Sequence, residues 1–218
     1  MKKLFTALIM VVLLLSLCSC DFAEASIFYD HVANAVDGFN VGYNKTFGYA
    51  FLGKYSWDGT EEGMHIVLPE TYNGAKVTEL GGFCGRGVPT PFGVNVTNEA
   101  WEKLCPDMID YSWSFEGNNI SQKDIKDDNI AYWRFQLHIG KNVKSITKMS
   151  AFGGVYRTEY EENGETLYRI FILTCYVTCD EQNPVFYAKD GKLYWRETNM
   201  AVEEFCYEDF DLSAVLEQ

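Results

Sequence analysis

Short turn signals between apolar, aromatic runs limit the fold of this chain more than any other feature. Asn73-Gly74, Asn163-Gly164 and Asp190-Gly191 each separate two such runs. These dipeptides accept the positive φ angles of tight hairpin turns and favour antiparallel strands on either side. The runs are rich in Tyr, Phe and Trp, which favour strands. The sequence therefore predicts a mainly β fold with antiparallel hairpins, and helix only as a minor α+β component.

The apolar runs also give approximate strand positions. Strands are expected at residues 47–55, 64–68, 77–80, 130–139, 155–160, 167–178, 185–187 and 192–195. A further dipeptide, Asp58-Gly59, predicts a hairpin between the first two of these strands. A short helix is expected up to Leu104, with Asn98 as its N-cap and Pro106 ending it. No Pro- or Ser-rich linker interrupts residues 47–218, so we expect them to form one β-rich domain.

The N-terminus has the pattern of an export signal. Lys2 and Lys3 precede an unbroken apolar run over residues 4–17. This run is shorter than the roughly 20 residues that a transmembrane helix needs, but it suits the apolar part of a signal peptide. The chain is therefore expected to be exported.

A lipidation signal follows the apolar run. Residues 17–20, Leu-Cys-Ser-Cys, resemble the lipobox of bacterial lipoproteins, although Cys18 stands where Ser, Ala or Thr is usual. The resemblance implies removal of residues 1–19 and a diacylglyceryl group on Cys20. Two acyl chains anchor a protein stably, so we expect the chain on the outer face of a bacterial membrane, at the cell surface or in the periplasm. Cleavage at Ala-Glu-Ala, residues 23–25, is the alternative and leaves an unanchored protein.

Residues 20–46 are expected to be a lipidated tether or a short helix that precedes the β-rich domain. Five side chains in this segment share one face at helical spacing: Ile27, His31, Val32, Ala35 and Val36. Gly38 would end such a helix.

The charge of the chain excludes two classes of partner. Its net charge is −13, and removal of residues 1–19 takes away two lysines and leaves −15. Binding to a nucleic-acid backbone needs a basic patch, so no nucleic-acid partner is expected. An anionic lipid surface would also repel the chain, so contact with the membrane depends on the lipid on Cys20.

Five cysteines follow Cys20, and their number leaves at least one thiol unpaired. They are Cys84, Cys105, Cys175, Cys179 and Cys206. Four residues along a strand span about 13 Å, and bridged Cα atoms lie within about 7 Å. Cys175 and Cys179 therefore should not bond to each other, whereas the other pairings stay open. Neither the cysteine spacing nor the three histidines suits zinc, so no metal site or cofactor is expected.

Three segments share a sequence pattern that is found in one repeat family. Residues 66–81 run from Ile-Val-Leu-Pro through Tyr-Asn-Gly to Val-Thr-Glu-Leu-Gly; residues 137–152 and 176–194 contain related pieces. They are similar to leucine-rich repeats of the BspA type, which occur in bacterial surface proteins. The resemblance implies a short leucine-rich-repeat-like β-solenoid, decorated by long insertions. Three units are near the minimum for such a core, and insertions often carry the binding face.

Sequence motifs of common enzymes are absent. The chain lacks a G-x-S-x-G elbow, an H-E-x-x-H pair and a Walker loop. The glycine-rich residues 81–87 lack the Lys-Ser/Thr of a phosphate loop. Cys84 as a nucleophile, with His65 or His138 as its base, has no local support. The acidic residues 203–211 lack the glycine turn of a calcium loop and are expected to form a solvated tail.

We therefore expect a lipid-anchored, non-enzymatic binding or adhesion module of the cell envelope. Its ligand, an extracellular protein or glycan, would contact the insertions and aromatic strand faces. An envelope hydrolase on a β-scaffold is one alternative, and it requires a deep pocket with convergent polar groups. A structural subunit of an envelope complex is another, and it requires a large exposed apolar patch. The sequence leaves open the ligand, the oligomeric state and the type of envelope, monoderm or diderm.

Overall fold

The structure, a computed structural model, describes residues 31–44, 48–84, 88–117, 120–121 and 129–212. The expected signal peptide, the lipobox with Cys20 and the first part of the tether lie outside these residues. Strands dominate the described chain, which confirms the predicted mainly β class. Within the described residues, no helix is both long enough and apolar enough to span a membrane.

Two large sheets make up most of the molecule. The first has seven strands: β1 (His31–Val36), β2 (Phe39–Asn44), β3 (Tyr49–Trp57), β6 (Ala75–Leu80) and β12 (Ser145–Ile146) in that order, with β5 (Thr71–Tyr72) on β6 and β9 (Gly93–Val96) on β3. The second has five, in the order β10 (Met108–Ser114), β13 (Gly154–Glu162), β14 (Glu165–Cys179), β11 (Ile130–Ile139) and β4 (His65–Val67).

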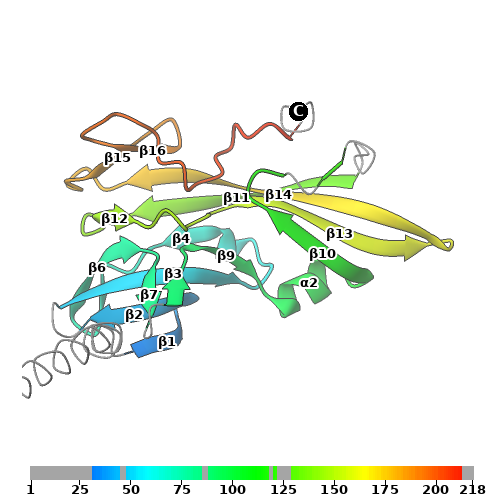
Figure 1. Ribbon diagram of the computed structural model, residues 1–218, viewed down its shortest axis with the longest axis horizontal. Helices are drawn as coiled ribbons and strands as arrows, with labels where there is room; N and C mark the ends of the chain where they lie inside the picture. Colours follow the sequence, from blue (N-terminus) through cyan, green and yellow to red (C-terminus); the bar gives the residue numbers. More distant parts are fainter. Residues whose placement is uncertain (1–30, 45–47, 85–87, 118–119, 122–128, 213–218) are drawn as a thin grey trace, which may run out of the picture.

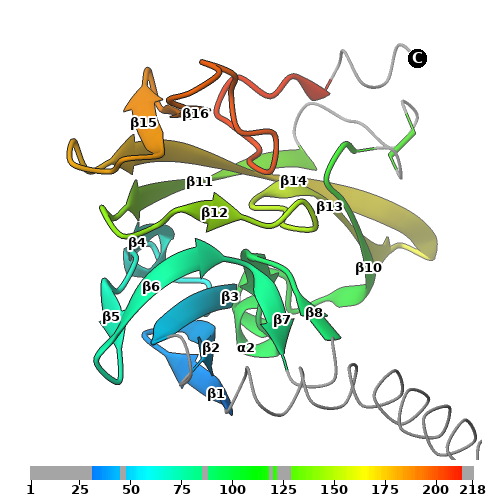
Figure 2. The ribbon, with the colours of Figure 1, turned by 60° about the vertical axis from the view of Figure 1, so that its left-hand side comes forward.

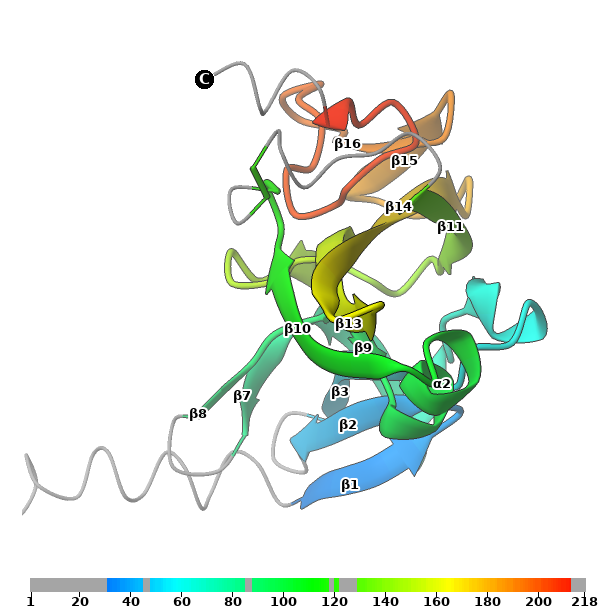
Figure 3. The same cartoon turned by 90° about the vertical axis from the view of Figure 1, so that its right-hand side faces the viewer.

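Smaller elements complete the described fold. The pairs β7 (Gly82–Cys84) with β8 (Val88–Thr90) and β15 (Phe186–Lys189) with β16 (Lys192–Trp195) are antiparallel hairpins. The helices are the single 3-10 turn η1 (Glu62–Met64) and α2 (Asn98–Leu104). Figure 3 shows the layers: β1, β2 and β3 below, β11 and β14 above them, and β15 and β16 beyond β14.

The main core lies between the two large sheets. Trp57 on β3 packs edge-on against Trp133 and Phe135 on β11, with ring centroids 4.8 and 5.3 Å apart. Alternate β11 residues are buried, from Trp133 to Ile139, while the residues between them face outward. This period of two fixes which face of β11 is available for binding.

Three predicted hairpin turns are confirmed. At Asn73-Gly74, Asn163-Gly164 and Asp190-Gly191 both residues have positive φ, between 48° and 80°. Each pair directly joins two antiparallel strands: β5 to β6, β13 to β14, and β15 to β16. In Figure 1 the long β13–β14 hairpin extends on the opposite side of the molecule from β15 and β16.

The hairpin predicted around Asp58-Gly59 is wrong. Strand β3 pairs with β2, β6 and β9, whereas β4 pairs in parallel with β11. The Asp58 carboxylate accepts hydrogen bonds from the Thr60 N–H at 3.1 Å and the Thr60 hydroxyl at 2.7 Å. The 3-10 turn η1 follows, so the chain leaves β3 through a longer connection instead of a two-residue turn.

The short helix expected within residues 20–46 is wrong where that segment is described. Residues 31–36 and 39–44 form the antiparallel strands β1 and β2, which extend the seven-stranded sheet beyond β3. Asp37-Gly38 joins them with φ angles of 49° and 83°, the same turn chemistry as in the other hairpins. The β-rich domain therefore begins by His31 rather than at residue 47.

The predicted helix is confirmed, with a different cap. Helix α2 covers Asn98–Leu104, but its N-cap is Thr97, whose hydroxyl accepts a hydrogen bond from the Ala100 N–H at 3.2 Å. Asn98 is thus the first helical residue. Trp101, on the inner side of α2, is buried against Trp133 and Phe171.

The three segments that resemble repeats lie side by side at their first strands. Leu137 pairs in parallel with Ile66 on one side and with Val177 on the other. The second strands of the first two segments are also in register, since Ile146 pairs with Leu80. Figure 2 shows β6 beside β12 and β11 beside β14. The third segment departs from this pattern, because its later residues form the antiparallel β15–β16 hairpin.

Candidate functional site

A hollow of about 380 Å³ lies on the five-stranded sheet, on the face turned away from the main core. We call it the outer-face hollow. Its lining residues come from β4, β11, β14 and the C-terminal segment: His65, Ile66, Val67, Gln136, Leu137, His138, Tyr176, Thr178 and Glu208. The strands are parallel, so the same positions of each strand meet in rows across the sheet.

Two rows of side chains form the floor. One row runs His65, Gln136, Tyr176 across β4, β11 and β14, and the next runs Val67, His138, Thr178. The neighbouring residues Ile66, Leu137 and Val177 point inward and are buried. Because side chains alternate along a strand, burial of these three places both rows on the outer surface.

Tyr176 is the aromatic side chain of the hollow, and 42% of its surface is exposed. Its ring rests on Gly191 in the β15–β16 turn, where an added Cβ would lie 2.5 Å from the ring. The Val177 N–H donates to the Gly191 carbonyl at 2.8 Å, which holds the turn against β14. Gly191 also has a φ of 77°, so both its conformation and its closeness to the ring require glycine.

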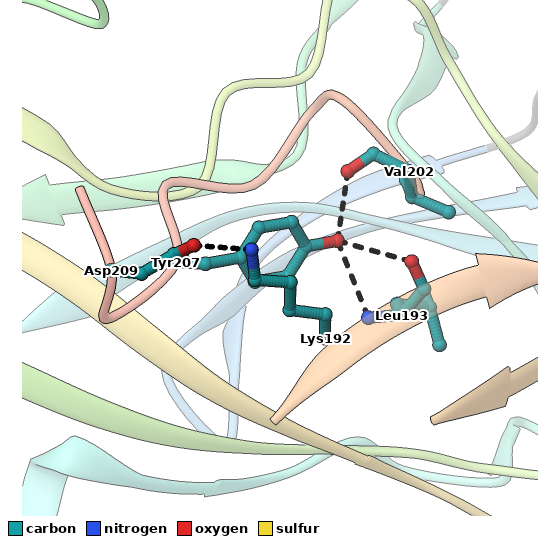
Figure 4. A network of polar contacts seen from close by, with 5 residues as sticks. All are labelled: Lys192, Leu193, Val202, Tyr207 and Asp209. Carbon is teal, nitrogen blue, oxygen red and sulfur yellow. Dashed lines mark hydrogen bonds and ion pairs between the residues drawn. The ribbon is translucent and has the colours of Figure 1, made fainter. Parts of the chain in front are cut away.

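The C-terminal segment supplies Glu208 and is fixed next to it by Tyr207 (Figure 4). The Tyr207 hydroxyl donates to the Val202 carbonyl at 2.8 Å and accepts from the Leu193 N–H at 3.3 Å. Burial raises the pKa of Tyr207, so its hydroxyl stays protonated and able to donate. The ion pair of Lys192 with Asp209 holds the segment on the other side of Glu208.

The solvated tail expected over residues 203–211 is therefore wrong. Phe205 and Cys206 are buried, and Phe205 forms a parallel bridge with Phe152. The Cys175 N–H donates to the Cys206 carbonyl at 2.8 Å, so this segment completes the edge of β14 where β13 ends. Although the segment is rich in acidic residues, its apolar side chains Phe205 and Cys206 and the flanking Val202 and Leu212 are buried in the fold.

The hollow brings together the two histidines but not the cysteine considered with them. His65 and His138 both line it, and His138 Nδ1 lies 3.0 Å from the Thr178 hydroxyl oxygen. Cys84 belongs to β7, in the separate β7–β8 hairpin. Cys84 is not among the residues that line the hollow.

Four cysteines are described as free thiols: Cys105, Cys175, Cys179 and Cys206. Cys175 and Cys179 do not bond to each other, as predicted from their spacing. Burial raises the pKa of Cys179 to about 11 and that of Cys206 to about 12, and it also raises those of Cys175 and Cys105. The thiolate form that nucleophiles and metal ligands require is disfavoured at all four positions.

Metal-ligating side chains do not gather in the part of the chain that the structure describes. There, no three His, Cys, Asp or Glu residues lie close enough together to hold an ion. The polar groups of the outer-face hollow are spread along an open sheet surface, an arrangement suited to contact with a ligand.

A second group of exposed apolar side chains lies on the edge strand β10. Ile109, Tyr111 and Trp113 are exposed at alternate positions. The Tyr111 ring stacks 5.4 Å from Trp101, and the Trp113 ring lies 6.4 Å from Tyr156. These two rings extend the aromatic core to the surface and pack on buried rings, whereas Tyr176 rests on a glycine.

In comparisons with known proteins, no protein-family model matches the chain, and no curated protein or solved structure matches it either. The functional argument therefore rests on the residues of the chain itself.

Proposed function

We propose that this chain is an exported, lipid-anchored, non-enzymatic binding module of the bacterial cell envelope, and that it contacts its ligand through the outer-face hollow. The observation that carries the proposal is an open hollow on a firmly packed sheet, floored by aromatic, apolar and neutral polar side chains. Val67 and Tyr176, 72% and 42% exposed, are held rigidly by the strands that bear them. Exposed side chains that are already ordered before binding lose little conformational entropy when they contact a ligand.

We further propose that the scaffold is a short, decorated solenoid of the leucine-rich-repeat kind. Parallel register of Ile66, Leu137 and Val177 supports this, as does the register of Leu80 with Ile146. Turns of successive segments are also bonded to each other: the Asp180 N–H donates to the Ile139 carbonyl at 2.9 Å. Such repeats present their side chains as a regular, extended binding face.

One buried side chain ties the last two turns together. Asn183 is 1% exposed and donates to the Gly140 and Val143 carbonyls at 2.8 and 2.9 Å. Its side-chain oxygen accepts from the N–H groups of Val185 and Phe186. The amide thus satisfies backbone groups of two neighbouring turns, which supports a stacked-repeat scaffold.

A non-enzymatic role is favoured by the chemistry of the described side chains. The polar groups of the hollow are distributed over three strands and the C-terminal segment, whereas catalysis of hydrolysis requires a site that converges polar groups on one reacting atom. The four described thiols are buried with raised pKa values and are poor nucleophiles.

The lipid anchor is tested by intact-mass analysis of the membrane-fraction protein, wild type against Cys20→Ala. We expect a wild-type mass of residues 20–218 plus acyl chains, and soluble or precursor protein in the variant. A mass that begins after Ala25 without lipid would overturn the anchor and leave a freely secreted or periplasmic protein.

The binding role is tested by retention of cells that produce the full chain on surfaces coated with mucin, collagen or purified peptidoglycan. Gln136→Arg places a long charged side chain in the centre of the hollow and should abolish retention. Thr71→Arg, on an exposed strand of the other sheet, is the matched control. Retention of Gln136→Arg cells at the wild-type level, or no retention of wild-type cells on any surface, would contradict the proposal.

A further inference from the structure

We infer that the outer-face hollow binds a short, neutral saccharide, with Tyr176 as the platform on which a sugar ring stacks. This inference rests on the proposed binding function and names the ligand class for the same site. It follows from the size of the hollow, from its charge and from the hydrogen-bonding character of its side chains.

The size of the hollow fits a small ligand. The two rows span two strand spacings, about 10 Å, and two residues along the strands, about 7 Å. A stable protein–protein interface buries about 800 Å² on each partner, far more than these six side chains offer. Pockets for small molecules begin near 300 Å³, and this one measures about 380 Å³. A peptide that extends a sheet would use a strand edge, whereas the hollow lies on the face of three strands.

The charge of the hollow disfavours anionic ligands. Glu208 is the one Asp, Glu, Lys or Arg side chain in its lining. The whole chain carries a net charge of −13, so an acidic sugar or phosphate would meet repulsion at both short and long range.

The polar groups suit hydroxyl-rich ligands. Gln136, Thr178 and Tyr176 each contain a group that donates and a group that accepts, and the two histidines of the lining add ring nitrogens that form hydrogen bonds. A sugar hydroxyl also donates and accepts, so both its hydrogen and its oxygen can form hydrogen bonds with such side chains. A purely cationic ligand would need acceptors alone, and Glu208 is the one lining side chain that only accepts in its charged form.

Tyr176 supplies the apolar contact that saccharides use. The flat C–H face of a sugar ring packs on an exposed aromatic ring, and the Tyr176 ring is 42% exposed while it contacts Gly191. Gln136 is its in-register neighbour on β11, about 5 Å away between the strands, so a ring stacked on Tyr176 lies within reach of the amide. Thr178 lies two residues farther along β14. Its side-chain hydroxyl, which lies 3.0 Å from His138 Nδ1, can bind a second hydroxyl group of the sugar.

The test uses the full chain purified in detergent and saturation-transfer NMR with maltotriose, cellotriose, chitotriose, xylotriose and mannotriose. We expect at least one trisaccharide to bind, with binding weakened at least tenfold in Tyr176→Ala and in Gln136→Ala, and largely kept in Tyr176→Phe. Tyr132→Ala is the matched control, because Tyr132 is 53% exposed on the same face of β11 but does not line the hollow. It should bind like wild type, and all variants must keep the wild-type circular dichroism spectrum.

Three outcomes would overturn the inference. These are no binding of any trisaccharide, binding that Tyr176→Ala and Gln136→Ala leave unchanged, and binding of choline chloride in place of the sugars, which would assign the hollow to a cation. The proposed binding function fails separately: it survives a negative sugar result if Gln136→Arg still abolishes retention of cells on collagen. If no sugar binds and Gln136→Arg cells are also retained like wild type, both the proposed binding function and the saccharide inference are wrong.

Discussion

The two ends of the long strand β14 differ in how they are built and in what they can do. From Glu165 to Arg169 the strand pairs, among the described residues, only with β13, the other arm of its own hairpin. From Thr174 to Cys179 it pairs with β11 on one side. On the other side, Cys175 bonds Cys206 of the C-terminal segment and Val177 bonds Gly191 of the β15–β16 turn. The first end depends on local contacts around Asn163-Gly164, and the second on contacts between three distant parts of the chain.

This difference places the candidate site where the packing is deepest. The residues around the hairpin tip, from 161 to 166, are exposed, whereas Cys175 and Val177 are fully or almost fully buried beneath the hollow. A local hairpin forms easily but frays, while the long-range end forms only with the whole fold. A binding surface needs the rigid end, and the predictions below test whether the two ends differ in this way.

The largest expected effect follows from Phe135→Ala, beneath the rigid end. Phe135 is fully buried and packs edge-on against Trp57 and Phe152. Truncation of such a ring costs about 3–5 kcal/mol of unfolding free energy. Tyr168→Ala, in the half-buried hairpin end, should cost much less. Guanidinium unfolding of the full chain measures both, and equal losses would show that the two ends are equally structural.

A matched pair of turn glycines gives the next effect. Gly164 and Gly191 have φ angles of 78° and 77°, but a Cβ on Gly164 meets nothing within 4 Å, whereas one on Gly191 meets the Tyr176 ring. Alanine at Gly164 should cost about 1–2 kcal/mol from its left-handed backbone alone. Gly191→Ala should cost more and should also change the fluorescence of a reporter dye placed at residue 178 through Thr178→Cys. Equal costs with no spectral change would show that the Tyr176 ring moves freely away from the turn.

The same contrast explains which parts of the fold were predictable. Asn163-Gly164 carries its own conformational preference, so the β13–β14 hairpin follows from a few adjacent residues. The pairing of His65 with Gln136 joins residues 71 positions apart, and no local pattern encodes it. Asp58-Gly59 was misleading for the same reason: Gly59 has a positive φ of 81°, but the strands that pair with β3 are β2, β6 and β9.

Part of the candidate site could have been predicted from the sequence. Alignment of the repeat-like segments places Ile66, Leu137 and Val177 at one position, and the residues directly before them are His65, Gln136 and Tyr176. Glu208 had no such signal. Its segment reads as acidic, and only the contacts of Tyr207 and Phe205 with distant residues bring it to the hollow.

A smaller effect is expected from Tyr207→Phe at the rigid end. The variant keeps the ring but removes the hydroxyl that bonds the Val202 carbonyl and the Leu193 N–H. Loss of these partners should cost about 1–2 kcal/mol and loosen the segment that bears Glu208. Hydrogen exchange of residues 201–210 should accelerate, whereas exchange of residues 155–172 should not change. Tyr160→Phe, in the hairpin end, is the control, and uniform acceleration in both regions would contradict a local anchoring role.

The smallest expected effect concerns pH at the hairpin end. The Arg169 guanidinium donates to both carboxylate oxygens of Asp107, at 2.6 and 2.9 Å, and holds the pKa of that carboxyl below its usual 3.8. A folded-state pKa below the unfolded value means that the pair stabilises the fold above about pH 4 and that this contribution is lost as the pH falls through the folded pKa. Because Asp107 is exposed, solvent screens the pair and the effect should be small.

Asp107→Asn should therefore lower the unfolding midpoint slightly at pH 7, and this difference from wild type should shrink as the pH falls through the folded-state pKa of the carboxyl. Glu161→Gln removes the same charge from an exposed site at the hairpin tip and is the control for the loss of one negative charge. Thermal unfolding between pH 2 and pH 7 measures both. A larger loss of stability in Asp107→Asn than in Tyr207→Phe at pH 7 would contradict the proposed difference between the two ends of β14. A screened surface pair would then stabilise β14 more than the buried contacts around the hollow.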